Sequence, residues 1–129
     1  MTPQNPPGDT PADTPAEAAP ESPAPVSVMT FNAADASGAG GIAGDVATLA
    51  AMGAHTLPVT TSILIRDSAE VFDQHAIDPD AIAEQARTVL EDISITGWKV
   101  GFLGSAEGVS TVAEILSDYP DVPLVSYLP

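Results

Sequence analysis

Asp35-Ala-Ser-Gly-Ala-Gly-Gly-Ile-Ala-Gly-Asp45 is the stretch that decides the fold, because this glycine-rich run joins a strand-like segment to a helix-like one. Glycine adopts backbone conformations closed to other residues and lets the chain come close to a bound molecule. The helix start that follows directs free backbone N–H groups into the same space. This order is typical of an α/β protein that binds a small ligand at one edge of its sheet. A tight structural connection is the alternative interpretation of the turn.

Apolar and β-branched segments on both sides of the turn predict the strands of a sheet. The predicted strands cover residues 26–31, 57–65, 98–103 and 122–128, with a further short strand over 71–75. The predicted helices run from about 42 to 52, from 79 to about 93 and from 106 to about 118. Strands that alternate with helices predict an α/β fold with a mostly parallel sheet and flanking helices.

Capping residues support the three helices. Gly53 follows the first helix, where a cap glycine belongs, Asp78 precedes a proline at the start of the second, and Ser105 precedes the third. The apolar residues of the third helix that are expected to face the core are Val109, Val112, Ala113 and Leu116.

Residues 1 to about 25 differ from the rest in composition. They hold eight of the thirteen prolines and four acidic residues, but no Lys, Arg, Ile, Leu or Val. Such a stretch buries too little apolar surface to offset its ordering entropy, so a disordered acidic tail is predicted. It lacks the basic start and apolar centre of a secretory signal. The folded part is then expected over residues 26–129.

The charge and composition exclude several classes of function. The formal net charge is −15, and the cations are Arg66, Arg87 and Lys99. Nucleic acids and anionic membranes are therefore not expected as partners, because both require clustered cations. No apolar run has the length of a membrane span, and the absence of cysteine excludes disulfides and thiolate metal sites. His55 and His75 lack metal-ligand spacing. The cytoplasm is the default location.

Three segments in sequence order carry a further pattern: 33–45, then 52–62 with Met-Gly-Ala and Val-Thr-Thr-Ser, then 99–103 with Lys-Val-Gly-Phe-Leu. Together, residues 28–128 resemble the first half of the hydroxymethylpyrimidine/phosphomethylpyrimidine kinases of thiamine biosynthesis, which are ribokinase-like proteins. The first segment is similar to their motif Gly-x-Asp-Pro-Ser-Gly-Gly-Ala-Gly-Ile-Gln-Ala-Asp, the second to a helix end and a Val-Thr-rich strand, and the third to a Lys-Ile-Gly-Met-Leu strand.

The resemblance implies phosphorylation of a hydroxymethylpyrimidine by ATP with Mg²⁺. It places Asp45 at the acid that hydrogen-bonds the pyrimidine. The substrate-binding residues that it implies are Ala33, Gly40, Asp45, Arg66 and Phe102, with Gly38, Gly41 and Gly101 as loop glycines. Asp45 has an alternative interpretation as an acid in the first helical turn that is stabilised by the helix dipole. Lys99 is interpreted as an exposed strand residue, and Arg66 as the partner of a surface acid.

Four of the departures from the family pattern bear on the substrate. Ala33 replaces its first glycine, Ala36 its proline, Arg66 a glutamine that contacts the pyrimidine, and Phe102 a methionine under the ring. An amide donates and accepts hydrogen bonds, whereas a guanidinium only donates. Arg66 therefore favours an anionic or phosphorylated substrate.

The family's ATP site and its Gly-Thr-Gly-[Asp/Cys] anion hole belong to the second half of that fold, and nothing here is similar to them. No catalytic or metal-binding residue is therefore predicted in this chain, and no kinase activity is expected from residues 1–129 by themselves. The chain is expected to be the substrate-side half of an enzyme. The alternative is a non-catalytic module that binds a small molecule or a partner chain. The last strand leaves the sheet uncovered, so a C-terminal half or a second copy is expected to cover it.

Overall fold

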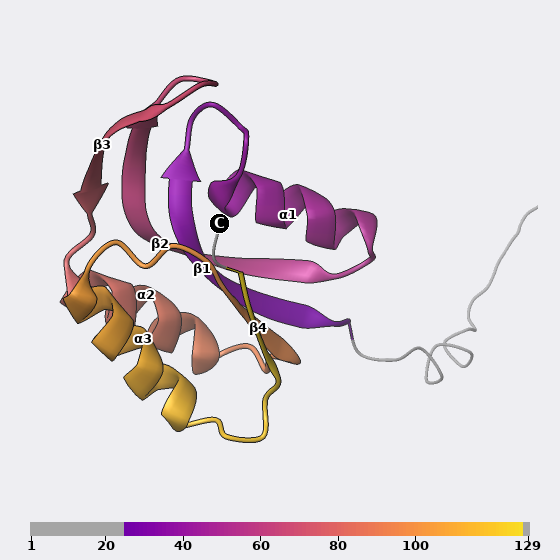
Figure 1. Cartoon of the computed structure of the whole chain (residues 1–129). Helices are drawn as coiled ribbons and strands as arrows, with labels where there is room; N and C mark the ends of the chain where they lie inside the picture. The colour runs from indigo at the N-terminus through magenta and orange to yellow at the C-terminus, as the bar shows by residue number, and fades with distance from the viewer. Residues whose placement is uncertain (1–24, 128–129) are drawn as a thin grey trace, which may run out of the picture.

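The computed structural model describes residues 25–127, with strands and helices in the arrangement of Figure 1. The strands are β1 (Ser27–Asp35), β2 (His55–Arg66), β3 (Val71–Ala76), β4 (Gly97–Val100) and β5 (Leu124–Ser126). The helices are α1 (Gly41–Ala51), α2 (Pro79–Leu90) and α3 (Ala106–Ser117). The predicted order of elements is confirmed. The predicted tail lies, except for Pro25, outside the described residues and stays a prediction.

Within residues 25–127 the strands form one sheet in the order β3-β2-β1-β4-β5. The central strand β1 is parallel to β2 and β4, and β4 is parallel to β5. In this part of the chain β3 alone is antiparallel, because a short hairpin joins it to β2. The mostly parallel sheet is therefore confirmed. The register between β1 and β2 shifts between Asn32 and Ala33, and such an irregularity changes the direction of nearby side chains.

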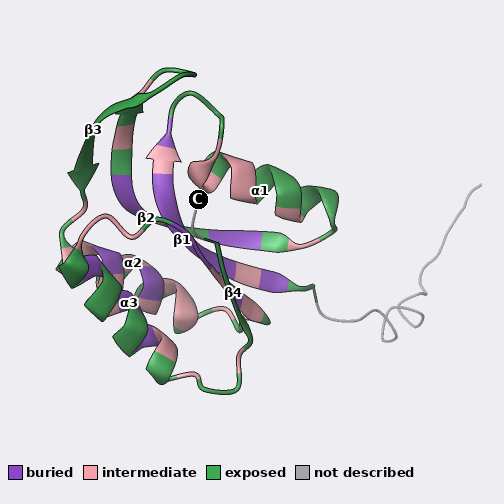
Figure 2. Ribbon diagram, viewed as in Figure 1, coloured by how far each residue is buried: buried purple, intermediate pink, exposed green. Residues whose placement is uncertain are grey.

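The two faces of the sheet are packed differently. Figure 2 shows buried residues where α2 and α3 meet the sheet, whereas α1 has no buried residue. Met29 and Phe31 of β1 are fully buried in the core with Ile82 of α2. Successive side chains of a strand point to opposite faces, so Thr30 and Asn32 of β1 face α1. Both are buried, and polar side chains therefore occupy the sheet under α1.

α2 and α3 begin at the predicted caps and α1 ends at the predicted glycine, whereas α2 ends at Leu90 and not near residue 93. The side chains of Asp78 and Ser105 accept hydrogen bonds from N–H groups in the first turns of α2 and α3. Gly53, with φ at 83°, follows α1, and the two N–H groups after the cap bond back to carbonyls of its last turn. None of the helices in the described part of the chain is long and apolar enough to cross a membrane.

α3 presents a different face to the core from the one predicted. Val112 and Leu116 pack against the core as expected, but Val109 and Ala113 are exposed and Ile115 is buried instead. The reason is that α3 packs mainly against α2, so its buried stripe turns toward that helix.

Two strands are shorter than predicted. β4 ends at Val100 and not at Leu103, because side chains bind the backbone of Phe102 in place of a neighbouring strand. The N–H of Phe102 donates to Oδ1 of Asn32, and the carbonyl of Phe102 accepts from the Thr61 hydroxyl. β5 covers Leu124–Ser126 in place of 122–128, and residue 128 lies outside the described residues.

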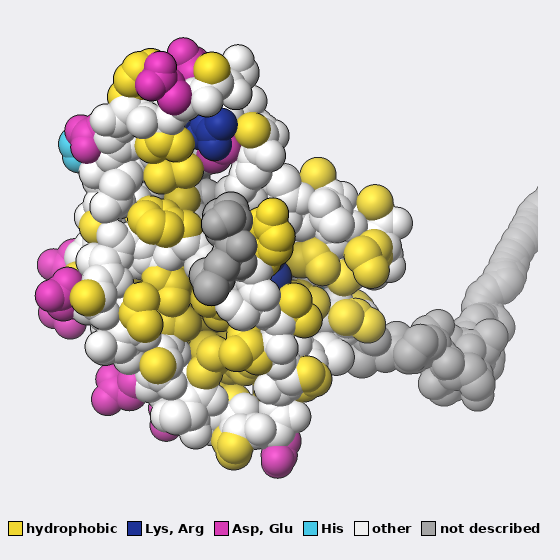
Figure 3. All heavy atoms as spheres, in the orientation of Figure 1, with side chains coloured by type: hydrophobic (Ala, Val, Ile, Leu, Met, Phe, Trp, Pro, Cys, Tyr) yellow, Lys and Arg dark blue, Asp and Glu magenta, His cyan; other side chains and the backbone are white. Residues whose placement is uncertain are grey.

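β5 is an edge of the described sheet and carries exposed apolar side chains. Leu124, Val125 and Tyr127 are exposed, as is Val109 of α3. Figure 3 shows hydrophobic side chains gathered on the face that β5 crosses. An edge of this kind is open to pairing with another chain or segment.

Candidate functional site

A cavity of about 700 Å³ opens between α1 and the carboxyl ends of β1, β2 and β4. Ligands of parallel α/β sheets bind at this end of the strands. The predicted site residues that line it are Ala33, Gly40, Gly41, Asp45, Arg66, Gly101 and Phe102. Gly38 lies in the same turn but does not line the cavity. The lining also includes Asp35, the first residue of the glycine-rich run, and Asn32, Lys99 and Tyr127, for which the sequence suggested no place in the site.

Asp35, the last residue of β1, organises the glycine turn. Its side chain is 1% exposed. Its carboxylate accepts hydrogen bonds from the Ser37 hydroxyl (2.7 Å) and from the N–H groups of Ser37 (2.9 Å) and Gly40 (3.1 Å). The Ala39 N–H donates to the Ser37 hydroxyl, and the Gly38 N–H donates to the Asp35 carbonyl. The amides from Ser37 to Gly40 are therefore used inside the turn and form no cradle for phosphate.

Charge and hydrogen bonding keep Asp35 ionised. The bond from the Ser37 hydroxyl is the main reason that the pKa of Asp35 lies below its ordinary value. Burial opposes this shift, and the Ser37 and Gly40 amides and the charge of Arg66 reinforce it.

The turn requires glycine at Gly41. Its φ is 70°, and a Cβ atom there would lie 2.4 Å from the carbonyl oxygen of Ala33. The presence of glycine at this position is therefore explained by the alternative interpretation, in which the turn is a tight structural connection. Gly40 is not required by the backbone in this way, because a Cβ atom added there would have an Asp35 oxygen at 4.0 Å as its nearest neighbour. Without a side chain, Gly40 leaves the cavity open.

Asp45 of α1 is the centre of the polar network in the cavity. Its Oδ1 atom lies 2.8 Å from Nζ of Lys99. Its Oδ2 atom accepts hydrogen bonds from the Thr30 hydroxyl (2.6 Å) and from Nδ2 of Asn32 (3.0 Å). Burial acts to raise the pKa of Asp45, but the bonds from Lys99, Thr30 and Asn32 outweigh it, and the pKa is lowered. The carboxylate is therefore held charged and in one orientation.

Two interpretations from the sequence are wrong here. Asp45 is not in the first turn of the helix, because α1 begins at Gly41, and the dipole effect fades beyond that turn. Lys99 is not an exposed strand residue, since only 22% of its side chain is exposed. Its neighbours Trp98 and Val100 face the core, so the alternation of β4 directs Lys99 toward α1.

Arg66 also lines the cavity, and its partner is buried and not a surface acid as expected. Its NH1 atom lies 3.6 Å from Oδ2 of Asp35. The two cations of the cavity, Arg66 and Lys99, therefore balance its two carboxylates, Asp35 and Asp45.

Asn32 joins two walls of the cavity. Its Oδ1 atom accepts from the N–H groups of Ala33 (2.9 Å) and Phe102 (3.1 Å), while Nδ2 donates to Asp45. A Cβ atom on Gly101 would lie 2.6 Å from this amide, so the loop after β4 approaches it only as glycine.

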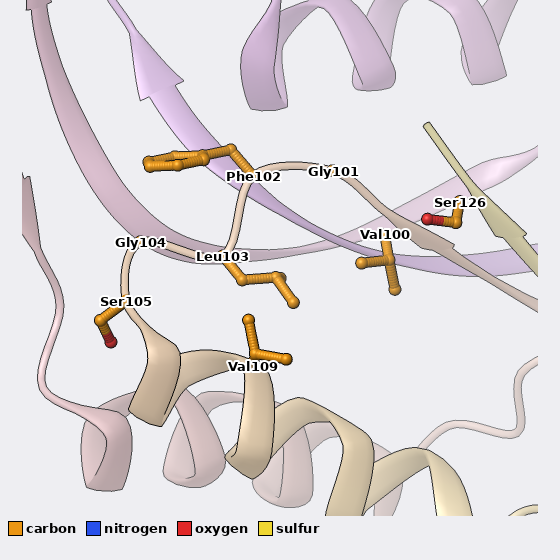
Figure 4. A pocket seen from close by; sticks show the side chains of 8 residues that line it. All are labelled: Val100, Gly101, Phe102, Leu103, Gly104, Ser105, Val109 and Ser126. Carbon is orange, nitrogen blue, oxygen red and sulfur yellow. The ribbon is translucent and has the colours of Figure 1, made fainter. Parts of the chain in front are cut away.

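A second cavity, of about 500 Å³, lies between the loop 101–104 and α3. Figure 4 shows Leu103 and Val109 pointing toward one another there, whereas the ring of Phe102 is directed away from them. Its lining holds no titratable side chain, so it offers no acid–base chemistry.

The residues of the main cavity fit an uncharged polar ligand better than a metal ion or a triphosphate. Residues 25–127 hold no group of three or more His, Cys, Asp or Glu side chains that could bind a metal. The carboxylates of Asp35 and Asp45 are each paired with a cation, and the amides of the turn are bonded internally. No step of phosphate transfer is therefore assigned to these residues.

The polar residues missed in the sequence share one signal. Thr30 alternates with Met29 and Phe31 in the predicted strand 26–31, and Asn32 continues this alternation one residue beyond the predicted end, in the observed β1. A period of two with polar residues on one side indicates a strand whose second face is polar.

A family profile and the sequences of known proteins identify one family. A family profile described as "Phosphomethylpyrimidine kinase" matches residues 35–126. A hydroxymethylpyrimidine/phosphomethylpyrimidine kinase of Streptomyces coelicolor is 37% identical over 101 residues, which are 78% of this chain and 37% of that protein. A probable chloroplastic thiamine biosynthetic bifunctional enzyme of rice is 35% identical over 108 residues, which are 84% of this chain and 20% of that protein.

A solved structure supports the same relation. The crystal structure of phosphomethylpyrimidine kinase from Clostridium difficile 630 is similar with a TM-score of 0.73 and 30% identity. The likeness covers 78% of this chain and 44% of that one. The chain therefore spans less than half the length of each protein compared.

Proposed function

The chain belongs to the phosphomethylpyrimidine kinase family, and on this premise we propose that it forms the substrate-binding part of a kinase that acts on a hydroxymethylpyrimidine in thiamine biosynthesis. The family of the chain and its ribokinase-like α/β fold both agree with the resemblance found in the sequence. The names of the relatives supply the substrate class and the pathway of those proteins, and we extend both to this chain.

The observation that carries the proposal is the position of Asp45. Its carboxylate lines a cavity at the carboxyl end of a parallel sheet and is held there by three hydrogen bonds. An ionised carboxylate accepts a hydrogen bond from an exocyclic amine. Gly40 and Gly101 border the same cavity without side chains, which leaves room for a flat ring.

The charge balance of the cavity favours the neutral hydroxymethylpyrimidine over its phosphate. Arg66 is the residue that favoured an anionic ligand in the sequence, but Asp35 already neutralises it. An added phosphate would have to compete with a buried carboxylate for this guanidinium. The phosphorylated pyrimidine is therefore expected to bind more weakly than the neutral hydroxymethylpyrimidine.

Kinases of this family use ATP and a metal ion in general, and we propose that both act on groups outside residues 25–127. No acidic cluster in that range fits a metal, and the turn amides are occupied. The part described here would bind and orient the pyrimidine, while the phosphate-transferring groups come from elsewhere in the assembled enzyme.

A binding titration tests the proposal. Calorimetry of the full chain with hydroxymethylpyrimidine should detect binding, and Asp45→Ala should weaken it by about tenfold or more, because a charged hydrogen bond is lost. Asp92→Ala, which removes an exposed acid outside the cavity, is the matched control and should bind like the wild type. Equal affinities of wild type and Asp45→Ala would remove Asp45 from the site.

A second candidate is a non-catalytic module that binds the pyrimidine. The internal use of the turn amides favours it, because these groups then cannot hold phosphate. Incubation with ATP, Mg²⁺ and hydroxymethylpyrimidine separates the two. The enzyme hypothesis expects the chain to become active only when a polypeptide similar to the remaining part of the relatives is added. The cytoplasmic location stays a prediction, which cell fractionation checks.

A further inference from the structure

We propose, resting on the function proposed above, that Asn32 and Asp45 together determine specificity by binding one edge of an aminopyrimidine. This edge is the one at which an exocyclic amine adjoins a ring nitrogen. Both side chains line the cavity, and they are joined by a hydrogen bond of 3.0 Å.

The orientation of the Asn32 amide follows from its partners. Oδ1 accepts two backbone N–H groups, from Ala33 and Phe102, and these occupy both of its acceptor positions. The flipped amide would set an NH₂ group against two N–H donors and an oxygen against the carboxylate of Asp45. Nδ2 therefore faces Asp45 on the cavity side.

The two side chains each keep one hydrogen-bonding position for a ligand. Nδ2 of Asn32 carries two N–H bonds and uses one of them on Oδ2 of Asp45. Oδ2 also accepts from Thr30, so it is filled, whereas Oδ1 of Asp45 accepts from Lys99 and retains a second lone pair. A donor on Asn32 and an acceptor on Asp45 are thus left side by side.

An aminopyrimidine edge has the complementary pattern. Its amine donates to Oδ1 of Asp45, and its ring nitrogen accepts from Nδ2 of Asn32. The oxo analogue of the same ring reverses both groups, with a carbonyl in place of the amine and a ring N–H in place of the bare nitrogen. It would face Asp45 with an acceptor and Asn32 with a donor, and such mismatches with buried polar groups are costly. Gly101 maintains the arrangement, because any larger residue would meet the Asn32 amide.

The test compares two ligands on four forms of the full chain. Calorimetry gives the dissociation constants of hydroxymethylpyrimidine, which carries the amine, and of its oxo analogue. The wild type should prefer the amine, and Asn32→Ala should lower the ratio of the two constants by about tenfold, because one hydrogen bond and one mismatch are removed. The ratio is unaffected by partial unfolding of a variant, since both constants scale with the competent fraction. Asn32→Ser, which keeps a donor, should retain part of the preference.

Thr30→Val is the matched control. Thr30 is fully buried and binds the same oxygen of Asp45 as Asn32 does, so the variant disturbs Asp45 without removing a donor to the ligand. Because Asp45 keeps its bonds to Asn32 and Lys99 in this variant, the ratio should fall less than in Asn32→Ala. An unchanged ratio in Asn32→Ala, or an equal fall in Thr30→Val, would overturn the role of Asn32 alone. Failure of the wild type to bind either pyrimidine would overturn the proposed function, and the role of Asn32 with it.

Discussion

Nζ of Lys99 lies 2.8 Å from Oδ1 of Asp45, and this ion pair joins β4 to α1. The two residues are 54 positions apart, so they meet only after β4 has paired with β1 and α1 has packed on the sheet. The side chains are 22% and 13% exposed, and attraction between charges is stronger where water is largely excluded. The pair therefore links the stability of the fold to the chemistry of the cavity.

Replacing Lys99 by Met should destabilise the fold. The change keeps much of the apolar stem but leaves Asp45 charged without its cation, and we expect a loss of about 1–3 kcal/mol in the free energy of unfolding. Urea denaturation at neutral pH measures it. Arg87→Met is the control, because Arg87 and Asp118 are also 2.8 Å apart but are 41% and 53% exposed. Its loss should stay below about 1 kcal/mol, and equal losses would contradict the importance of burial.

Stability should fall in acid because of Asp35 and Asp45. The Ser37 hydroxyl for Asp35, and hydrogen bonds that outweigh burial for Asp45, lower both pKa values from the ordinary 3.8. The unfolded chain then takes up protons first as the pH falls, so the stabilisation is complete above about pH 5 and disappears as the pH drops through the folded pKa values. Urea denaturation across this range should show a decline that begins near pH 4. Asp45→Asn should make the decline shallower, and an unchanged slope would contradict the assignment.

Alanine at Gly41 and at Gly44 should have opposite effects. At Gly41 the backbone is left-handed and a Cβ atom would clash with a carbonyl, so we expect a loss of about 2 kcal/mol or more. Gly44 lies within α1, where nothing is within 4 Å of its Cβ position, and alanine should stabilise by about 0.5–1 kcal/mol. Thermal unfolding of both variants checks the pair. Destabilisation by both would mean that α1 does not begin where the structure places it.

The β5 edge should cause the chain to associate. Val125 is 64% exposed on this strand, and a lysine there should reduce self-association because a charge opposes strand pairing. Sedimentation velocity over a range of concentrations measures the effect. Met52→Lys introduces the same charge at an exposed position after α1 and should leave association unchanged. A wild-type chain that is monomeric at all concentrations would show that this edge is not used.

Local signals in the sequence were sufficient to predict the helix caps, because at a cap one residue determines the backbone conformation. Asp78 and Ser105 act as caps because their side chains bond N–H groups only two or three residues away. Gly53 ends α1 because it tolerates a positive φ. The end of β4 was predicted three residues too late, because Asn32 and Thr61, far away in the sequence, bind Phe102.

The site was predictable only in part, because its residues could be located along the chain but their distant partners could not. Motif resemblance located Asp45 and Arg66, and both line the cavity, but their partners lie elsewhere in the chain. Asp35 was quoted as the start of the glycine run, yet its bonds to the turn depend on how the loop closes over it. Asn32 carried a visible signal, its alternation with buried Met29 and Phe31, but only pairing of the strands showed what it touches.

The sequence by itself determined the order of strands and helices, the family and the glycine-rich turn that borders the cavity, because these depend on periodicity and on residues close together in the chain. Tertiary structure alone decided which charges meet. Lys99 faces Asp45 and Arg66 faces Asp35 because parallel pairing of β4 and β2 with β1 sets their register and brings their side chains to the α1 face. Such contacts depend on distance in space, and no pattern along the chain encodes them.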